Sequence, residues 1–197
     1  MSEIQRTNWN LKSDKMHQYA FWDNFLSKEE CKKIIKQGKK LRLKKSVTIN
    51  SPKKKGVRKS DISWIYPDKD TLWLFRRATD VILDLNNQFF NFDISGLNEG
   101  FQFTNYKYPD GHYGKHIDRA FDIEIRKLSI SIQLTDPKDY KGGDLKLYHS
   151  SDDEGEIMKK EQGTLIMFPS FTMHEVLPVT KGERNSLVAW VTGKPFK

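Results

Sequence analysis

Two histidines and an aspartate are the residues of this sequence best suited to chemistry. His116 and Asp118 are separated by a single residue, and His174 follows much later in the chain. Two imidazoles and one carboxylate form a ligand set that holds Fe(II) on three adjacent positions and leaves the opposite face open for a co-substrate and oxygen. Arg184 comes next, and its guanidinium can grip a carboxylate through two parallel hydrogen bonds. Together these residue types indicate oxidative chemistry at an iron centre.

β-Strands are the elements that must bring these side chains together. Residues 101–106 alternate like a half-buried strand and run into a turn at 109–111, so we expect His116 and Asp118 just beyond a strand end. Residues two apart on an extended chain project from the same face. That geometry lets the His116 imidazole and the Asp118 carboxylate converge on one metal ion.

Later strands supply the two remaining side chains. Residues 164–168 form an apolar run, after which a short loop leads to His174. Residues 185–191 are the next expected strand, with Arg184 at its start. A lone histidine is more often a capping or core residue than a ligand, but an ordered set of ligands, turns and strands is hard to explain in that way.

The order of these motifs resembles that of the Fe(II)- and 2-oxoglutarate-dependent dioxygenases, in particular the small prolyl/lysyl hydroxylase domain type. The resemblance runs from Phe101 to Trp190, and less specific similarities occur at 25–31 and 57–64. The matching residues are Tyr106, Tyr113, His116, Asp118, Asp136, Pro137, Tyr140, Gly142, Gly143, Leu145, Gly163, Phe168, Pro169, Ser170, His174, Val176, Pro178, Val179, Gly182, Arg184 and Ser186.

The resemblance implies a fold that is mainly β with flanking helices (α+β). It would be a double-stranded β-helix, a cupin-like jelly roll with the iron at its open end, buttressed by helices from the N-terminal half. We expect one helix at 27–38, which Ser27 and Glu30 begin as a capping box. A long helix is expected at about 70–90. Its apolar stripe consists of Leu72, Phe75, Ala78, Thr79, Ile82, Leu85 and Phe89.

The composition suits this architecture. Residues 1–18 are polar and expected to be partly disordered, whereas 19–197 would form a single dioxygenase domain, with 37% hydrophobic residues in the chain. The one cysteine, Cys31, excludes an intramolecular disulfide and is expected to be buried in the first helix. Because no apolar signal core or membrane-length run occurs, we expect a cytoplasmic protein that does not enter a membrane.

The resemblance also implies the cofactors: Fe(II), 2-oxoglutarate and O2, with ascorbate as an optional reductant. The iron ligands and catalytic residues would be His116, Asp118 and His174. Arg184 would bind the C5 carboxylate of 2-oxoglutarate, and Ser186, which points the same way along the strand, could add a hydrogen bond. Tyr106 matches the tyrosine that contacts 2-oxoglutarate, but one residue is inserted before the histidine, so Tyr108 is a rival.

The reaction implied is that of an oxidoreductase that hydroxylates prolyl residues in a peptide or protein, like a prolyl 4-hydroxylase, and releases succinate and CO2. Tyr113, Arg126 and Trp190 occupy positions that line the peptide site in similar enzymes. An aromatic wall suits a proline ring, and an arginine suits a peptide carbonyl. Equally, Trp190 could be a core residue and Arg126 a surface charge.

Three other functions stay open. A hydroxylase acting on a free amino acid or another small molecule would have the same iron site. A nucleic-acid demethylase would explain the net charge of +8, but that group has a second arginine six positions after the first, where this chain has Trp190. A non-enzymatic basic binding module should have lost a ligand or Arg184, and this chain retains all four.

Basic residues are concentrated early in the chain. Strands expected at 41–49 and 58–65 flank a loop at 50–57, and the stretch 36–59 contains lysine and arginine but no acidic residue. Such a stretch can bind nucleic acid or an acidic peptide, or can simply be solvated surface. In similar prolyl hydroxylases this loop folds over the substrate, so 51–56 is a candidate mobile lid.

Overall fold

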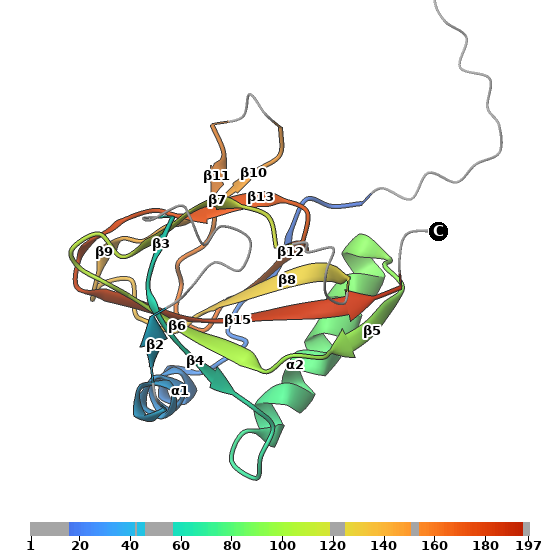
Figure 1. Cartoon of the computed structure of the whole chain (residues 1–197). Helices are drawn as coiled ribbons and strands as arrows, with labels where there is room; N and C mark the ends of the chain where they lie inside the picture. Colours follow the sequence, from blue (N-terminus) through green and yellow to red (C-terminus); the bar gives the residue numbers. More distant parts are fainter. Residues whose placement is uncertain (1–15, 42, 46–56, 119–124, 151–153, 195–197) are drawn as a thin grey trace, which may run out of the picture.

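The computed structural model describes residues 16–41, 43–45, 57–118, 125–150 and 154–194. Two β-sheets lie face to face, and the helices pack on the outer side of the larger one (Figure 1). This arrangement is the expected double-stranded β-helix. Within the part of the chain described, no helix is both long and apolar enough to cross a membrane.

The larger sheet has eight strands and provides the base of the fold. Its order is β1-β12-β8-β15-β6-β4-β2, and β5 pairs with the C-terminal end of β15. The strands are β1 (Ala20–Trp22), β2 (Lys44–Lys45), β4 (Asp61–Ile65), β5 (Ile94–Leu97), β6 (Phe101–Lys107), β8 (Arg126–Gln133), β12 (Leu165–Pro169) and β15 (Glu183–Gly193).

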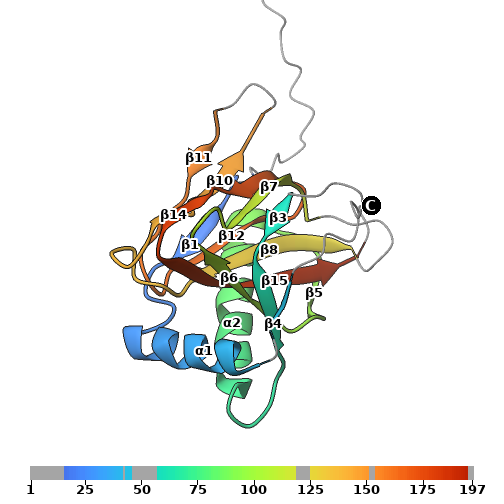
Figure 2. The ribbon, with the colours of Figure 1, turned by 60° about the vertical axis from the view of Figure 1, so that its left-hand side comes forward.

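The smaller sheet has five strands in the order β11-β10-β13-β7-β3 and covers the other side of the interior (Figure 2). Its strands are β3 (Arg58–Lys59), β7 (His112–His116), β10 (Leu145–Tyr148), β11 (Glu156–Ile157) and β13 (Met173–Val176). A separate pair joins β9 (Lys141–Gly142) to β14 (Val179–Lys181).

Two helices buttress the larger sheet, as the sequence predicts. Helix α1 (Lys28–Lys40) begins with the expected capping box, in which Ser27 and Glu30 bond to each other's backbone N–H groups. Helix α2 (Leu72–Leu85) continues into a π-helical segment, η1 (Asn86–Phe90). Burial of apolar side chains between these helices and the sheet forms the larger core, which includes the completely buried Cys31.

Three details differ from the predicted elements. The helix expected at 70–90 changes to π geometry because the Asn86 carbonyl accepts the Asn91 N–H, while the Asn86 side chain bonds the backbone of Phe92. Two residues placed on the apolar stripe are exposed: Leu72, which is 39% exposed at the first turn, and Thr79, which lies on the solvent side of α2. The strand expected at 58–65 is two strands, because the chain passes from the smaller sheet to the larger one at Ser60.

Some predictions fall on parts of the chain that the structure leaves out. Of the strand expected at 41–49, residues 44–45 are described as β2, and 46–49 lie outside the described residues. The candidate lid at 51–56 and most of the polar segment 1–18 also lie outside them.

A second, smaller core lies between the two sheets and reaches the site described below. It consists of Tyr106, Leu145, Leu147, Met158, Ile166, Phe168, Val176 and Val179. The two cores together explain why the central strands are buried on both faces, as the pattern of β8 shows.

Candidate metal centre

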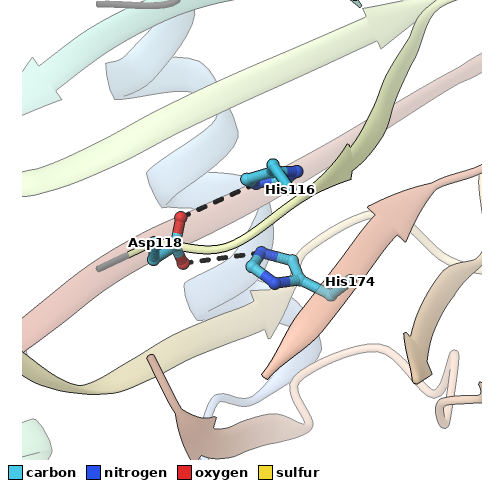
Figure 3. A group of neighbouring side chains, drawn as sticks. All are labelled: His116, Asp118 and His174. Atoms are coloured by element: carbon cyan, nitrogen blue, oxygen red, sulfur yellow. Dashed lines mark ion pairs between the residues drawn. The ribbon is translucent and has the colours of Figure 1, made fainter. Parts of the chain in front are cut away.

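Strand pairing in the smaller sheet brings the two histidines together. His116 is the last residue of β7, and in the register between β13 and β7 it is paired with His174. Asp118 follows two residues beyond the strand end. Figure 3 shows the three side chains pointing toward one another from these two segments. The sequence therefore predicted this convergence correctly, although β7 itself, between the turn and the ligands, was not foreseen.

The donor atoms converge on one point. Nε2 of His116 lies 3.6 Å from Oδ1 of Asp118, and Nε2 of His174 lies 3.5 Å from Oδ2. One donor atom from each of the three side chains lies within 4.8 Å of the others. A metal held by these atoms would be bound from one side, which is the arrangement of a facial triad.

Backbone carbonyls set the tautomer of both imidazoles. Nδ1 of His116 is 2.8 Å from the Gly114 carbonyl, and Nδ1 of His174 is 2.9 Å from the Thr172 carbonyl. A carbonyl oxygen only accepts, so Nδ1 must carry the proton in each ring. The lone pair on Nε2 is then free to face a metal, and the hydrogen bonds to the two carbonyls fix the orientation of each ring.

The protonation states also suit a metal. Burial, followed by the proximity of His174, lowers the pKa of His116 to about 3, so this imidazole is neutral near pH 7. Burial acts to raise the pKa of Asp118, but the two histidines and a 2.7 Å hydrogen bond from Ser129 Oγ outweigh it, and the net shift is downward. A neutral imidazole and a carboxylate are the forms that bind metal, so the donor set fits Fe(II).

Arg184 is 2% exposed and is paired with Tyr106, a member of the smaller core between the sheets. Its Nη2 donates to Oε1 of Gln133 at 3.0 Å, and Nη1 is 3.5 Å from Oγ of Ser186. Both partners are neutral, and among the described residues no acidic side chain forms an ion pair with this guanidinium. A buried charge without a counterion is costly. The site is therefore suited to a ligand that brings a carboxylate.

The two rival tyrosines occupy different environments. Tyr106 is paired with Arg184 across β6 and β15, is 2% exposed, and has the Arg184 guanidinium carbon 5.6 Å from its ring centroid. Tyr108 is 61% exposed at the surface. The geometry thus places Tyr106, and not Tyr108, beside the guanidinium.

The three residues expected to line a peptide site lie around the metal ligands. Tyr113 stacks on His116, while the Arg126 guanidinium lies 3.8 Å from the Trp190 ring. Arg126 is not a free surface charge, because its Nη2 donates to both carboxylate oxygens of Glu99 at 2.9 and 2.7 Å. Nε of Arg126 and Nε1 of Trp190 are buried without a hydrogen-bond partner in the described part of the chain.

Sequence reasoning missed several polar residues that support the site. Ser129 and Gln133 lie on β8, whose apolar residues face the helices and whose alternate polar residues are also buried. The signal available in the sequence was the alternation of polar and apolar residues along 126–133, between other expected strands. Glu99 gave no such signal, since its partner Arg126 is distant in sequence.

Two cavities lie away from the His116, Asp118 and His174 side chains. One of about 780 Å³ lies between α1 and the ends of β6 and β15, on the outer face of the larger sheet, and its lining includes Lys28, Asp136 and Glu183. Another of about 490 Å³ lies beside Lys115, Phe171 and Met173. Neither is lined by a triad residue.

Comparison with known proteins agrees with the site. Residues 101–192 match the family described as the 2OG-Fe(II) oxygenase superfamily. A PKHD-type hydroxylase of Parvibaculum lavamentivorans is 39% identical over 80 residues, which cover 40% of this chain and 36% of that protein. One of Sphingopyxis alaskensis is 34% identical over 125 residues, covering 59% and 56% respectively. The alignments thus span between about a third and just over half of these relatives.

Solved structures share the fold. A prolyl-4-hydroxylase of Pseudomonas putida superposes with a TM-score of 0.72 at 22% identity, covering 91% of this chain and 94% of that one. A prolyl hydroxylase of Trichoplax adhaerens, solved with a peptide fragment of a hypoxia inducible factor oxygen degradation domain, gives 0.74 at 19% identity, covering 89% and 84%. Residues 101–192 therefore match the 2OG-Fe(II) oxygenase superfamily, and the fold is like that of prolyl 4-hydroxylases.

Proposed function

We propose that this protein is an Fe(II)- and 2-oxoglutarate-dependent dioxygenase that hydroxylates prolyl residues in a peptide or protein and releases succinate and CO2. One observation carries the proposal. The buried guanidinium of Arg184, which has no acidic partner among the described residues, shares the space between the sheets with a one-sided His–Asp–His ligand set. A co-substrate with a carboxylate at one end and metal-binding oxygens at the other would satisfy both.

The tautomers of the two histidines and the charge of the aspartate suit the three residues to hold the iron. His116 and His174 present Nε2, and Asp118 presents a carboxylate that Ser129 orients. When bound, Fe(II) supplies oxygen activation coupled to decarboxylation of 2-oxoglutarate. The protein contributes the fixed geometry, since one-sided ligation leaves positions for the co-substrate and oxygen.

The residues around Arg184 would bind 2-oxoglutarate. Arg184 would take the C5 carboxylate in a bidentate contact, and Ser186 would donate a further hydrogen bond. Gln133 holds the guanidinium in place without neutralising its charge, because the amide carbonyl is an uncharged acceptor. Tyr106 and the apolar side chains of the smaller core would exclude water from the co-substrate.

A prolyl substrate is supported by the surroundings of the ligands and by the known activities of the structural neighbours. Trp190 is 7% exposed beside Asp118, whose pKa it helps to lower, and provides a flat apolar surface. Tyr113 offers its edge and hydroxyl. Nε of Arg126 is a buried donor that a peptide carbonyl could satisfy. The neighbours named above are prolyl hydroxylases, one of them bound to a peptide.

The test is mass spectrometry of proline-containing peptides incubated with the protein, Fe(II), ascorbate and 2-oxoglutarate. A gain of one oxygen on proline, absent when Asp118→Ala replaces the parent, is the expected result. Peptides with alanine in place of proline serve as the matched control. Oxidation of free proline alone, or demethylation of a methylated oligonucleotide, would replace the peptide assignment with one of the other two substrate classes.

A further inference from the structure

A stack of planar side chains runs through the metal centre. The rings of Tyr113 and His116 are nearly parallel, at 17°, with 3.5 Å between centroids. The His116 centroid is 4.1 Å from that of His174, and Phe168 packs edge-on against His174 at 4.8 Å. Each imidazole ligand therefore has an aromatic neighbour in addition to its backbone hydrogen bond.

Arg58 extends this stack beyond Tyr113. Its guanidinium carbon lies 4.5 Å from the centroid of the Tyr113 ring. Because His116 occupies one face of that ring at 3.5 Å, the guanidinium must lie over the other face. The two residues are also directly opposite each other in the pairing of β3 with β7. An arginine over a tyrosine face is attracted by the ring quadrupole.

The larger sheet holds Arg58 in this position. Nη2 donates to Oε1 of Gln102 at 2.8 Å, and Nε donates to Oγ of Ser60 at 2.9 Å. Gln102 belongs to β6 and is 5% exposed, whereas Arg58 belongs to the smaller sheet. Arg58 thus ties the two sheets together beside the metal ligands. A planar guanidinium, unlike an ammonium, can donate in two fixed directions and stack at the same time.

We propose that Arg58 and Tyr113 are positioning residues that fix the ring plane of His116, and so determine how tightly the triad holds its metal. The Gly114 carbonyl fixes one atom of the imidazole, but the ring can still tilt about that hydrogen bond. A ring packed flat against it restricts the tilt. The inference rests on the proposed function, because it requires that the triad bind a divalent metal.

The arrangement also limits what Tyr113 can offer a substrate. One face of its ring is covered by His116 and the other by Arg58. A substrate ring therefore cannot stack on Tyr113 and can meet only its edge or hydroxyl. Tyr113 therefore differs from Trp190, whose ring contacts Trp64 and Arg126 and not His116.

Co(II) binding to the metal-free protein tests the proposal without any turnover. Co(II) accepts the same nitrogen and oxygen ligands as Fe(II), and its visible absorption reports the coordination geometry. Tyr113→Leu should weaken Co(II) binding about 10- to 100-fold, the usual effect of losing a group that orients a metal ligand, and should change the spectrum. Tyr113→Phe keeps the ring and loses only the hydroxyl, so it should bind like the parent.

Arg58 provides an independent series. Arg58→Ala should weaken Co(II) binding about 10-fold, and Arg58→Lys should recover part of the loss, because an ammonium keeps the charge but not the fork. Since both residues act through one stack, the double variant with Tyr113→Leu should bind no more weakly than Tyr113→Leu alone. Lys59→Ala is the matched control, because Lys59 lies on the same strand and its ammonium donates to the Pro109 carbonyl at the surface.

The outcomes separate this inference from the proposed function. If the parent binds Co(II), and Tyr113→Leu binds it with the same affinity and spectrum, the positioning role is wrong while the metal centre stands. If the parent does not bind Co(II), or binds it no better than Asp118→Ala does, the metal centre and the positioning role are both wrong. Melting of the metal-free variants checks the fold. Should Tyr113→Leu not fold, Arg58→Ala and Arg58→Lys decide the question.

Discussion

The guanidinium of Arg184 on β15 donates to the side-chain carbonyl of Gln133 on the neighbouring strand β8, across 3.0 Å. Gln133 orients the cation but leaves its charge uncompensated. Since no acidic side chain of the described residues forms an ion pair with Arg184, this relationship gives the space between the sheets a fixed positive charge.

Removing the guanidinium should weaken binding of the co-substrate. We expect Arg184→Ala to raise the apparent requirement for 2-oxoglutarate by an amount equivalent to about 2 to 5 kcal/mol, because a buried charge-assisted contact is lost. Arg184→Lys should restore only part of it, since an ammonium cannot form the fork. Titration of succinate formation against 2-oxoglutarate measures this. A parent-like curve for Arg184→Ala would mean that the anchor lies elsewhere.

Removing the group that orients Arg184 should have a smaller effect of the same kind. Gln133→Leu should weaken 2-oxoglutarate binding by about 1.5 to 3 kcal/mol, the usual range for one hydrogen bond to a charged group. Gln162→Leu is the control, because Gln162 bonds the Leu134 carbonyl and lines the cavity on the outer face. Equal titrations for the two variants would remove Gln133 from the site.

The loss of any one triad ligand should stop turnover and leave the fold intact. His116→Ala, Asp118→Ala and His174→Ala each leave two ligands, which hold Fe(II) poorly, while the site lies at the edge of the smaller core. Succinate production should disappear, and the circular dichroism spectrum of the metal-free protein should be unchanged. A variant that keeps its turnover would exclude the substituted residue from the ligand set.

The metal-free protein should lose stability on acidification because of His116. Its pKa is about 3 in the folded state and near 6.5 when unfolded, so between these values the unfolded chain binds more protons. Stability therefore falls as the pH is lowered through this window, by up to about 1.4 kcal/mol per pH unit from this residue. His116→Leu removes the titration. Denaturant unfolding with a chelator from pH 7 to pH 4 should then give a shallower decline for the variant, and parallel declines would contradict the prediction.

The glycine that precedes β12 should contribute strongly to the free energy of unfolding. At Gly163 φ is +86°, and a Cβ would lie 2.0 Å from the Leu26 carbonyl oxygen. We expect Gly163→Ala to lower the free energy of unfolding by more than about 3 kcal/mol. At Gly96 φ is +137° but no atom of the described residues lies within 4 Å of a Cβ, so Gly96→Ala should cost only about 1 to 2 kcal/mol in backbone strain. Similar melting temperatures for the two variants would show that the contact with Leu26 can relax.

The site could be predicted from the sequence wherever it depends on local spacing and on the order of strands. His116, Asp118 and His174 converge because strand periodicity and antiparallel pairing leave few alternatives. The choice between Tyr106 and Tyr108 could not be made, because it depends on the register that pairs Tyr106 with Arg184.

Contacts between residues distant in sequence were beyond prediction. The pairing of Glu99 with Arg126, and the position of Arg58 between Gln102 and Tyr113, arise only when the sheets are assembled. The break between β3 and β4 has the same origin, since one stretch of sequence with strand character serves two sheets. These contacts surround the three converging side chains, which explains why the sequence predicted that set more closely than its surroundings.

Labelled oxygen gives the most direct test of the central claim. The protein would be incubated with Fe(II), 2-oxoglutarate and a proline-containing peptide under ¹⁸O₂, and both products would be weighed by mass spectrometry. A dioxygenase of the proposed kind must place one labelled atom in succinate and one on the peptide, and Asp118→Ala must place neither. If the parent forms no labelled succinate with or without peptide, the assignment of this centre as a 2-oxoglutarate-dependent dioxygenase is wrong.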